Sequence, residues 1–220
     1  MPQDIWTILK LIRWTDERFR QEGLPTPRLD AEVLLAESLG VDRVGLDTHF
    51  DQPLQPEELA RFRKMIRRRL AREPLAYIIG RREFWSLPLR VTPDVLIPRP
   101  ETEGLVAEAL KILAGAERLE QGWHILEIGT GSGAISIALA KEFSKASLVA
   151  TDLSEKALAL ARENAYRNGL QGRIQFLYGD LFDPLEKGSL FDLILSNPPY
   201  NPRSHLPSLA PEVRDFEPLV

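Results

Sequence analysis

The feature that most constrains the fold is a glycine-rich turn between an apolar strand and a helix. An apolar run at 123–128 leads into the turn E-I-G-T-G-S-G-A at 127–134, and a helical pattern follows over 134–143. Glycine lets the backbone approach a ligand closely, and the free N–H groups of a helix start favour a polar or anionic ligand. The turn therefore predicts a ligand site. Its candidate residues are Glu127, Gly129, Thr130, Gly131, Ser132 and Gly133.

Strand and helix patterns alternate after this turn. A buried strand is expected at 148–150, an alternating strand at 174–178 and a further strand at 191–195, and Ser154 can cap a helix that runs to Arg167. Alternation of this kind predicts a parallel sheet with right-handed crossovers. The fold class expected for this half of the chain is therefore α/β.

An acidic residue follows the second strand of this series. Asp152 stands where a carboxylate can accept hydrogen bonds from both hydroxyls of a ribose. Gly129, Gly131 and Ala134 also satisfy the dinucleotide fingerprint, so the loop alone does not separate NAD from S-adenosylmethionine. The alternative is that the glycines only allow close packing of strand on helix, which the position of Asp152 argues against.

The first 72 residues predict a small bundle of amphipathic helices. Apolar stripes and proline breaks place three helices, the third over 57–71. Short apolar runs at 77–79, 83–85 and 89–91 then predict strands that form a hairpin. The expected organisation is a helical domain at 1–74, a hairpin linker at 75–98 and a partial catalytic domain at 99–220.

A basic stretch covers the third helix and the segment after it, with Glu73 as its one acidic residue between 61 and 82. Such a charge run is commonly a solvated face, but it would also suit docking of an acidic partner or RNA. The two interpretations stay open. Its basic residues are Arg61, Arg63, Lys64, Arg67, Arg68, Arg69, Arg72, Arg81 and Arg82.

Composition excludes several classes of protein. The 220 residues contain no cysteine, which excludes a disulfide scaffold, a thiolate metal site and a cysteine nucleophile. A net charge of −4 excludes nucleic-acid binding by bulk charge alone. No apolar run approaches membrane-spanning length and no signal peptide is visible, so a cytoplasmic protein is expected. Nothing pairs His49, His124 or His205 with a nucleophile, and no metal is expected.

The fourth strand leads into N-P-P-Y at 197–200. A turn that ends a strand is the plain interpretation, since Asn and Pro commonly build one. The sequence N-P-P-Y resembles methyltransferases that act on a planar nitrogen, however, and the Asn197 side-chain oxygen and the Pro198 carbonyl can each accept an N–H from such a nitrogen. Proline at 198 and 199 stiffens the loop, and Tyr200 can stack on the acceptor plane. The predicted substrate-binding residues are Asn197, Pro198, Pro199 and Tyr200, and the predicted catalytic ones Asn197, Pro198 and Tyr200.

Together these motifs resemble class I S-adenosylmethionine-dependent methyltransferases, which have a Rossmann-like fold. Glu127 and the three glycines resemble the E-x-G-x-G-x-G loop that wraps the methionine half of the cofactor in that family. N-P-P-Y resembles enzymes that methylate adenine N6, guanine N2 or a glutamine amide. The cofactor-binding residues that the resemblance implies include, besides the loop, Asp152 at the ribose, Asp180 and Leu181 at the adenine, and also Leu153 and Asn197.

The resemblance narrows outside this core to the release-factor glutamine methyltransferases, the PrmC/HemK family. Its most distinctive segment is V-L-I-P-R-P-E-T-E at 95–103, and the match runs from about residue 5 to the end of the chain. It implies methylation of the N5 amide nitrogen of the glutamine in the Gly-Gly-Gln motif of peptide chain release factors. It also implies that Arg99 and Glu101 lie by the cofactor and that the helical domain helps to dock the release factor.

Three alternatives stay open beside this prediction. A ribosomal-protein glutamine methyltransferase would share the fold, the cofactor and N-P-P-Y, although Pro-Glu-Thr-Glu at 100–103 favours the release-factor branch. An N6-adenine or ribosomal RNA methyltransferase would act on nucleic acid, whereas the release-factor enzyme is not expected to bind it directly. A cofactor-binding module would dock a partner without catalysis.

The strand count predicts that the sheet is incomplete. The residues at 123–195 supply four strands, whereas the class I sheet has seven, so the C-terminal strands are expected to be missing. The run at 191–195 is apolar on both faces, as a central strand is. As an edge it would expose unpaired backbone. We therefore expect a truncated chain, or a partner that supplies the missing edge.

Overall fold

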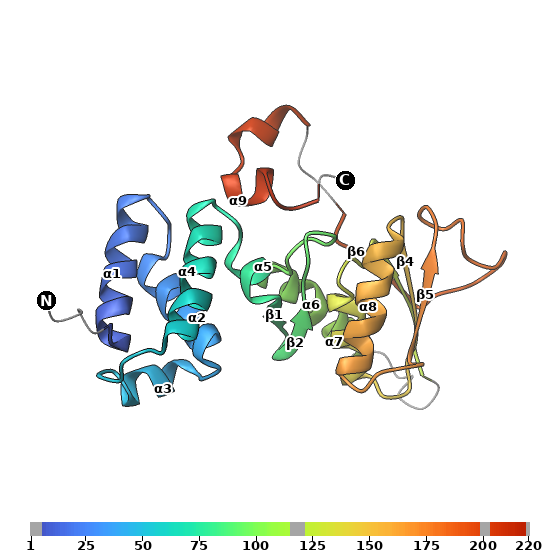
Figure 1. The fold of residues 1–220 in the computed structure, drawn as a ribbon. Helices are drawn as coiled ribbons and strands as arrows, with labels where there is room; N and C mark the ends of the chain where they lie inside the picture. Colours follow the sequence, from blue (N-terminus) through green and yellow to red (C-terminus); the bar gives the residue numbers. More distant parts are fainter. Residues whose placement is uncertain (1–5, 115–121, 199–202, 219–220) are drawn as a thin grey trace, which may run out of the picture. The chain divides into compact units, whose positions relative to one another are not determined.

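The computed structural model describes residues 6–114, 122–198 and 203–218. The chain forms two compact units, Met1–Ile79 and Gly80–Val220, and each is described by itself (Figure 1). Of the helices in the described part of the chain, none combines the length and the hydropathy that a membrane span requires.

The N-terminal unit is the predicted helical bundle. Its helices surround a core that contains Phe19, Leu34, Leu35, Leu46 and Phe62, each at most 2% exposed. The predicted helix boundaries at Pro27, Gly40 and Pro56 are confirmed. Pro27 and Pro56 are the first residues of their helices, and Gly40 ends a helix with a left-handed φ of 68°. The elements are α1 (Ile8–Gln21), α2 (Pro27–Leu39), α3 (Arg43–Thr48), α4 (Pro56–Leu70) and α5 (Leu75–Ile79).

One predicted strand in this region is wrong. The run at 77–79 belongs to helix α5, in which the N–H groups of Tyr77 and Ile78 donate to the Pro74 carbonyl at 3.0 and 3.1 Å. The Arg68 guanidinium donates to the carbonyls of Tyr77 and Ile78, at 3.2 and 3.3 Å. Proline at the helix start and an arginine at its last carbonyls therefore outweigh the strand preference of the β-branched pair.

The second unit begins with the predicted hairpin. Its two strands pair antiparallel, and the turn between them puts Trp85 and Ser86 at positive φ. A short 3₁₀ turn, η1 (Pro100–Thr102), leads directly into α6 (Glu103–Ala114). The remaining elements are β1 (Arg81–Phe84), β2 (Leu87–Arg90), β3 (His124–Ile128), α7 (Ala134–Glu142), β4 (Ser147–Asp152), α8 (Glu155–Arg167), β5 (Ile174–Tyr178), β6 (Leu193–Ser196), η2 (Arg203–Ser208) and α9 (Pro211–Arg214).

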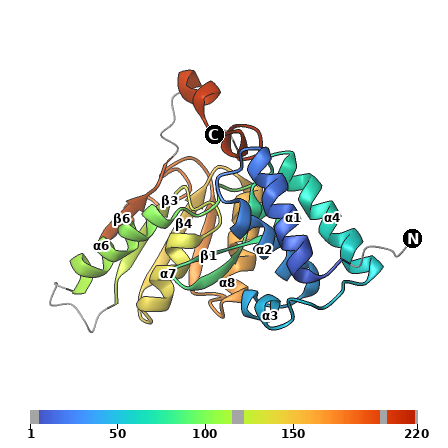
Figure 2. The same cartoon turned by 90° about the vertical axis from the view of Figure 1, so that its left-hand side faces the viewer.

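Four strands form the predicted parallel sheet, in the order β5-β4-β3-β6. Helices α6, α7 and α8 lie side by side along one of its faces (Figure 2). The core between these layers includes Ile125, Ile137, Leu148 and Ala150, all nearly inaccessible to solvent. The sheet and its helices thus make an α/β layer structure.

The order of the strands decides where ligand-binding residues meet. The chain passes from β3 to β4 on one side and reaches β6 on the other, so the direction of winding reverses at β3. Ligands of open α/β sheets bind outside the carboxyl ends of the strands at such a switch point. The residues after β3 and β6 therefore share one edge of the sheet. Among the described residues β6 is an outer strand, and its Ile194 is 50% exposed.

Candidate active site

The glycine loop after β3 contains glycines of two kinds. Gly129, Gly131 and Gly133 all have positive φ, between 54° and 82°. A Cβ on Gly133 would lie 3.1 Å from both Ala161 and Ile137, so this glycine serves close packing of the loop on the helices. A Cβ on Gly129 or Gly131 would meet no atom within 4 Å. These two glycines face open space, as a loop that a ligand approaches requires.

A hollow opens between this loop, the segment before α6 and the residue that follows β6. Its enclosed part measures about 70 Å³. A second cavity of about 230 Å³ lies beside it and is lined by Arg99, Glu101, Thr102, Leu105 and Asn197. Of the predicted site residues, the hollow brings together Arg99, Glu127, Gly129, Thr130, Gly131, Ser132 and Asn197. The others, namely Glu101, Gly133, Asp152, Leu153, Asp180, Leu181 and Pro198, do not line it.

The carboxylate of Glu127 is buried at the bottom of the glycine loop. Its Oε2 accepts hydrogen bonds from the Thr130 hydroxyl at 2.8 Å, from the Ser136 N–H at 3.0 Å and from the Ser136 hydroxyl. Burial raises the pKa of Glu127 to about 7, in part offset by these hydrogen bonds, and the nearby Asp152 carboxylate raises it further. Sequence reasoning missed Ser136, whose signal is a hydroxyl inside an otherwise apolar helix.

We expect the affinity for S-adenosylmethionine to increase between pH 6 and pH 8 because Glu127 ionises. With a pKa of about 7, roughly one-tenth of Glu127 is charged at pH 6 and about nine-tenths at pH 8. At the methionine end, where the sequence predicts that Glu127 binds, a charged carboxylate would attract the positive sulfonium and ammonium groups of the cofactor, so the Kd should fall by up to about tenfold. Calorimetric titration at three pH values measures this change.

Glu127→Gln is the matched control for the pH series, because it keeps the shape and the accepting oxygen but cannot ionise. Titration of the cofactor's own amino group affects both proteins, so only the difference between them reports Glu127. Equal pH dependence in the two would contradict the assignment. The raised pKa of Glu127 also makes the stability of the fold depend on pH. The folded chain binds the Glu127 proton more tightly than the unfolded chain does, so the contribution of Glu127 to the free energy of unfolding falls as pH rises from 4.5 towards 7.

Asp152 links the glycine loop to the loops after β4 and β5. Its Oδ2 accepts from the Gly131 N–H at 2.8 Å and its Oδ1 from the Ser154 N–H at 2.9 Å. Each oxygen keeps a further lone pair, so the carboxylate retains capacity for a diol. The Gly179 N–H donates to the Asp152 carbonyl at 3.1 Å, which places the β5 loop beside it.

Two apolar side chains stand exposed near Asp152. Leu153 is 57% exposed and Leu181 56%, and the Leu181 carbonyl accepts from the Thr151 hydroxyl at 3.2 Å. Asp180 beside Leu181 is exposed. Along the strand ends, a buried carboxylate is followed by glycines that face open space, by a carboxylate that can bind a diol, and by exposed apolar side chains. This series fits S-adenosylmethionine, which has a charged tail, a ribose and an adenine.

Asn197 lines both cavities from the carboxyl end of β6. Its Nδ2 donates to the Thr102 hydroxyl of η1 at 3.2 Å. Pro198 follows and is exposed. The other two residues of N-P-P-Y, Pro199 and Tyr200, lie outside the described residues.

The segment at 97–103 is fastened at both ends. The Arg99 guanidinium donates to both carboxylate oxygens of Glu217, at 2.6 and 2.7 Å, and the Glu217 side chain is only 3% exposed. Burial raises the pKa of Glu217, against the opposing effect of Arg99. At the other end the Trp85 N–H donates to the Glu103 carboxylate at 2.8 Å. Arg99, predicted beside the cofactor, thus lines the hollow while it binds the segment after η2.

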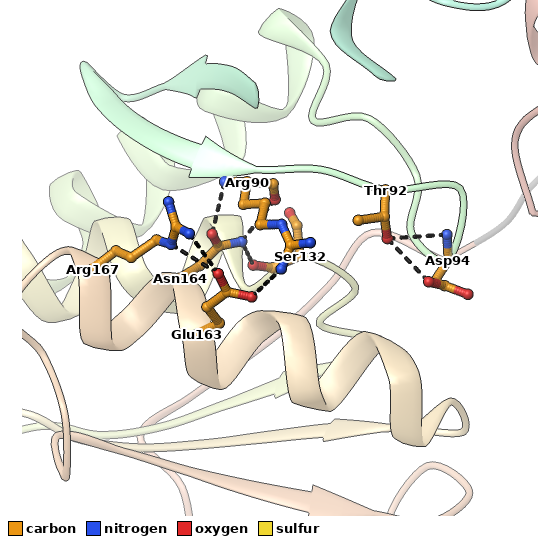
Figure 3. Close-up of polar contacts among 7 residues, drawn as sticks. All are labelled: Arg90, Thr92, Asp94, Ser132, Glu163, Asn164 and Arg167. Atoms are coloured by element: carbon orange, nitrogen blue, oxygen red, sulfur yellow. Dashed lines mark hydrogen bonds and ion pairs between the residues drawn. The ribbon is translucent and has the colours of Figure 1, made fainter. Parts of the chain in front are cut away.

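Asn164 on α8 joins the hairpin to the glycine loop, and sequence reasoning missed it. Its Nδ2 donates to the Ser132 carbonyl at 2.9 Å and to the Arg90 carbonyl at 3.0 Å, and its Oδ1 accepts from the Arg90 N–H at 2.7 Å (Figure 3). Its side chain is fully buried. The available signal is an amide on the apolar stripe of the predicted helix, since a buried polar group needs partners.

Part of the basic stretch is bonded inside the N-terminal unit, namely Arg61, Arg68, Arg69 and Arg72. Arg69 is buried and pairs with Asp30 at 2.7 Å, and Arg68 pairs with Glu73 at 2.5 Å. Neither predicted interpretation of the stretch anticipated these internal bonds. Other members reach backbone carbonyls, whereas Arg63, Lys64, Arg67, Arg81 and Arg82 are exposed. The three histidines are exposed as well: His49, His124 and His205.

Comparison with known proteins gives matches over both units. The family profile described as PrmC N-terminal domain matches residues 10–80, and the profile described as methyltransferase small domain matches residues 107–210. Among solved structures, the N-terminal domain of human METTL16 in complex with SAH matches with a TM-score of 0.45 and 21% identity, over 53% of this chain and 48% of that one.

Curated relatives share much more sequence. The release factor glutamine methyltransferase of Geobacter sulfurreducens is 48% identical over 98% of this chain, and that of Rhodopirellula baltica 45% over 97%. This chain spans 72% of the length of each. The predicted methyltransferase domain and the family resemblance are confirmed. With such identity along nearly its whole length, the chain belongs to the release factor glutamine methyltransferases.

Proposed function

We propose that this chain transfers a methyl group from S-adenosylmethionine to the N5 amide nitrogen of the glutamine in the Gly-Gly-Gln motif of peptide chain release factors. One observation carries the proposal: Asn197 lines the hollow of the glycine loop, in a chain 48% identical to a release factor glutamine methyltransferase. The same proposal places the enzyme in the cytoplasm, where translation ends.

The reaction requires the chain to position the reacting groups and does not require a strong base. An amide nitrogen is a poor nucleophile because its lone pair is delocalised into the carbonyl. S-adenosylmethionine, when bound, supplies a methyl group on a sulfonium, which is a good leaving group. The bond between the amide nitrogen and the methyl carbon forms as the carbon–sulfur bond breaks, the sulfur leaves as a neutral thioether, and the nitrogen gives one proton to solvent. Fixing the two reacting groups can contribute up to roughly 7–11 kcal/mol in well-oriented cases.

Asn197 and Pro198 are the residues that would hold the glutamine amide. The Asn197 oxygen can accept one N–H of the amide and the Pro198 carbonyl the other. Because Asn197 lines both cavities, an acceptor held by it has access to the glycine-loop side and to the second cavity. We assign stacking on the acceptor to Tyr200 and stiffening of the loop to Pro199, as the N-P-P-Y motif suggests.

We assign cofactor binding to the residues along the strand ends. Glu127, Gly129, Thr130, Gly131 and Ser132 would hold the methionine end, with Gly133 setting the packing of the loop. Asp152 would bind the ribose hydroxyls, and Leu153, Asp180 and Leu181 the adenine. The open space at Gly129 and Gly131, the capacity of Asp152 and the exposure of both leucines support this order.

The N-terminal unit would dock the release factor. Arg63, Lys64 and Arg67 are exposed on α4, and exposed cations attract an acidic partner surface. This assignment concerns the exposed part of the basic stretch only, since Arg68 and Arg69 are engaged inside the unit.

The proposal is tested with purified release factor and S-adenosylmethionine labelled in its methyl group. We expect label on the Gly-Gly-Gln peptide, located by mass spectrometry of the digested release factor. A release factor with this glutamine replaced by alanine is the matched control and should take up none. Label on a ribosomal protein alone, or on nucleic acid alone, would overturn the proposal, and cofactor binding without any transfer would favour a docking module.

A further inference from the structure

The Asn197 amide has a partner on a distant segment, and we propose that this partner, Thr102, is a positioning residue for methyl transfer. The Nδ2 of Asn197 donates to the Thr102 hydroxyl at 3.2 Å, across 95 residues of sequence. The inference rests on the proposed function, because it concerns how Asn197 meets the acceptor amide. It adds a residue outside N-P-P-Y and outside the glycine loop to the machinery.

The direction of the Asn197 amide matters because its two ends are chemically opposite. The oxygen accepts hydrogen bonds, whereas the nitrogen only donates them. A glutamine amide nitrogen presents N–H donors, so Asn197 must turn its oxygen towards the acceptor and its own nitrogen away. That nitrogen then needs an acceptor in the half-buried site, since an unpartnered polar group there costs free energy. The Thr102 hydroxyl supplies it in the observed orientation.

Thr102 is itself firmly placed. It ends η1, where its N–H donates to the Arg99 carbonyl at 3.0 Å, and it leads straight into α6, whose Val106 and Ala109 are buried in the core. The ion pair of Arg99 with Glu217 holds one side of this turn. A partner on such a turn restrains a side chain better than one on a free loop would.

The location of the pair supports the same conclusion. Thr102 and Asn197 both line the hollow at the glycine loop and the neighbouring cavity of about 230 Å³. The hydrogen bond between them therefore lies where the two spaces meet. An acceptor held by Asn197 and a cofactor held by the glycine loop would meet at this boundary.

Thr102→Val tests the inference, because valine keeps the shape and loses the hydroxyl. In steady-state methylation of the release factor we expect kcat to fall by roughly threefold to tenfold, the loss expected for one hydrogen bond. The Kd for S-adenosylmethionine, measured by calorimetry, should stay within about twofold. Thr102→Ser restores a hydroxyl and should recover most of kcat. Thr92→Val removes a hydroxyl that bonds Asp94 and should leave kcat unchanged.

A nuclear Overhauser contact between the Asn197 Nδ2 protons and the Thr102 methyl group tests the geometry without any acceptor. We expect it in the cofactor-bound wild type, together with a shift of the Asn197 side-chain resonance in Thr102→Val and none in Thr92→Val. If the wild type is active and Thr102→Val has the same kcat, this inference is wrong and the proposed function still stands. The same conclusion follows if the Overhauser contact is missing. Wild type that leaves release factor unlabelled would overturn the proposed function and, with it, this inference.

Discussion

Replacing Asn197 with alanine should lower kcat for release-factor methylation by about a hundredfold to a thousandfold. The side chain lies at the carboxyl end of β6, where its Nδ2 donates to the Thr102 hydroxyl, and its oxygen can accept a hydrogen bond from the substrate amide. Losing it removes an oriented acceptor, and the misplacement of a reacting group by about 1 Å costs on the order of a hundredfold. The loss of a preorganised polar group in other enzymes costs about 10²–10³.

Cofactor affinity separates this prediction from general damage. The residues assigned to the methionine end and the ribose come from β3, β4 and their loops, so the Kd for S-adenosylmethionine should change by less than about threefold. Calorimetry and single-turnover methylation are measured on the same preparations, with Ser208→Ala, an exposed position beyond the motif, as the control. A loss of cofactor affinity comparable to the loss of kcat would contradict the division of roles.

The parts of the fold predicted from sequence are those encoded by neighbouring residues. The glycines of the turn at 127–134 are close together in the sequence. Local capping likewise predicts the helix starts at prolines and after Ser154, and the helix end at Gly40. The strands of the sheet followed from short apolar runs of the right length. Once the strands are parallel, their carboxyl ends share one edge, so Asp152 and Asn197 could be placed near the glycine loop without coordinates.

The contacts that hold the site together could not be predicted in the same way. Asn164 reaches Arg90 across 74 residues, Asn197 reaches Thr102 across 95, and Arg99 reaches Glu217 across 118. No periodicity or spacing links residues so far apart. Their partners depend on how the hairpin, η1 and the segment after η2 pack, which is decided by tertiary structure.

The wrong strand at 77–79 shows the limit of local pattern. There Pro74 and Arg68 supply backbone partners that β-branched residues alone do not reveal. The apolar pattern of β6 predicts a central strand, and in the described residues β6 pairs with β3 and Ile194 is half-exposed. The expectation of further strands beside β6 stays a prediction.

The largest effect on stability is expected from Asp30→Ala, in the N-terminal unit. Asp30 and Arg69 are 2% and 4% exposed and pair at 2.7 Å, and Asp30 also accepts from the Thr26 hydroxyl at 2.6 Å. Removing the carboxylate takes the Asp30 counter-charge from a buried guanidinium, although the Glu73 carbonyl still accepts from it at 3.3 Å. Breaking a buried ion pair in this way costs about 3–5 kcal/mol of unfolding free energy, a large part of the stability of a unit this small.

Hydrogen exchange with mass spectrometry measures this loss in the intact chain, because it reports α2 and α4 separately from the sheet. Protection of these two helices should drop in Asp30→Ala while that of β3 and β4 is retained. Arg63→Ala on the exposed face of α4 should change the unfolding free energy by no more than about 0.5 kcal/mol. Adding Arg69→Met to Asp30→Ala removes the stranded charge and should recover much of the loss. If the double variant is as unstable as Asp30→Ala, the cost comes from lost packing rather than from an unpaired charge.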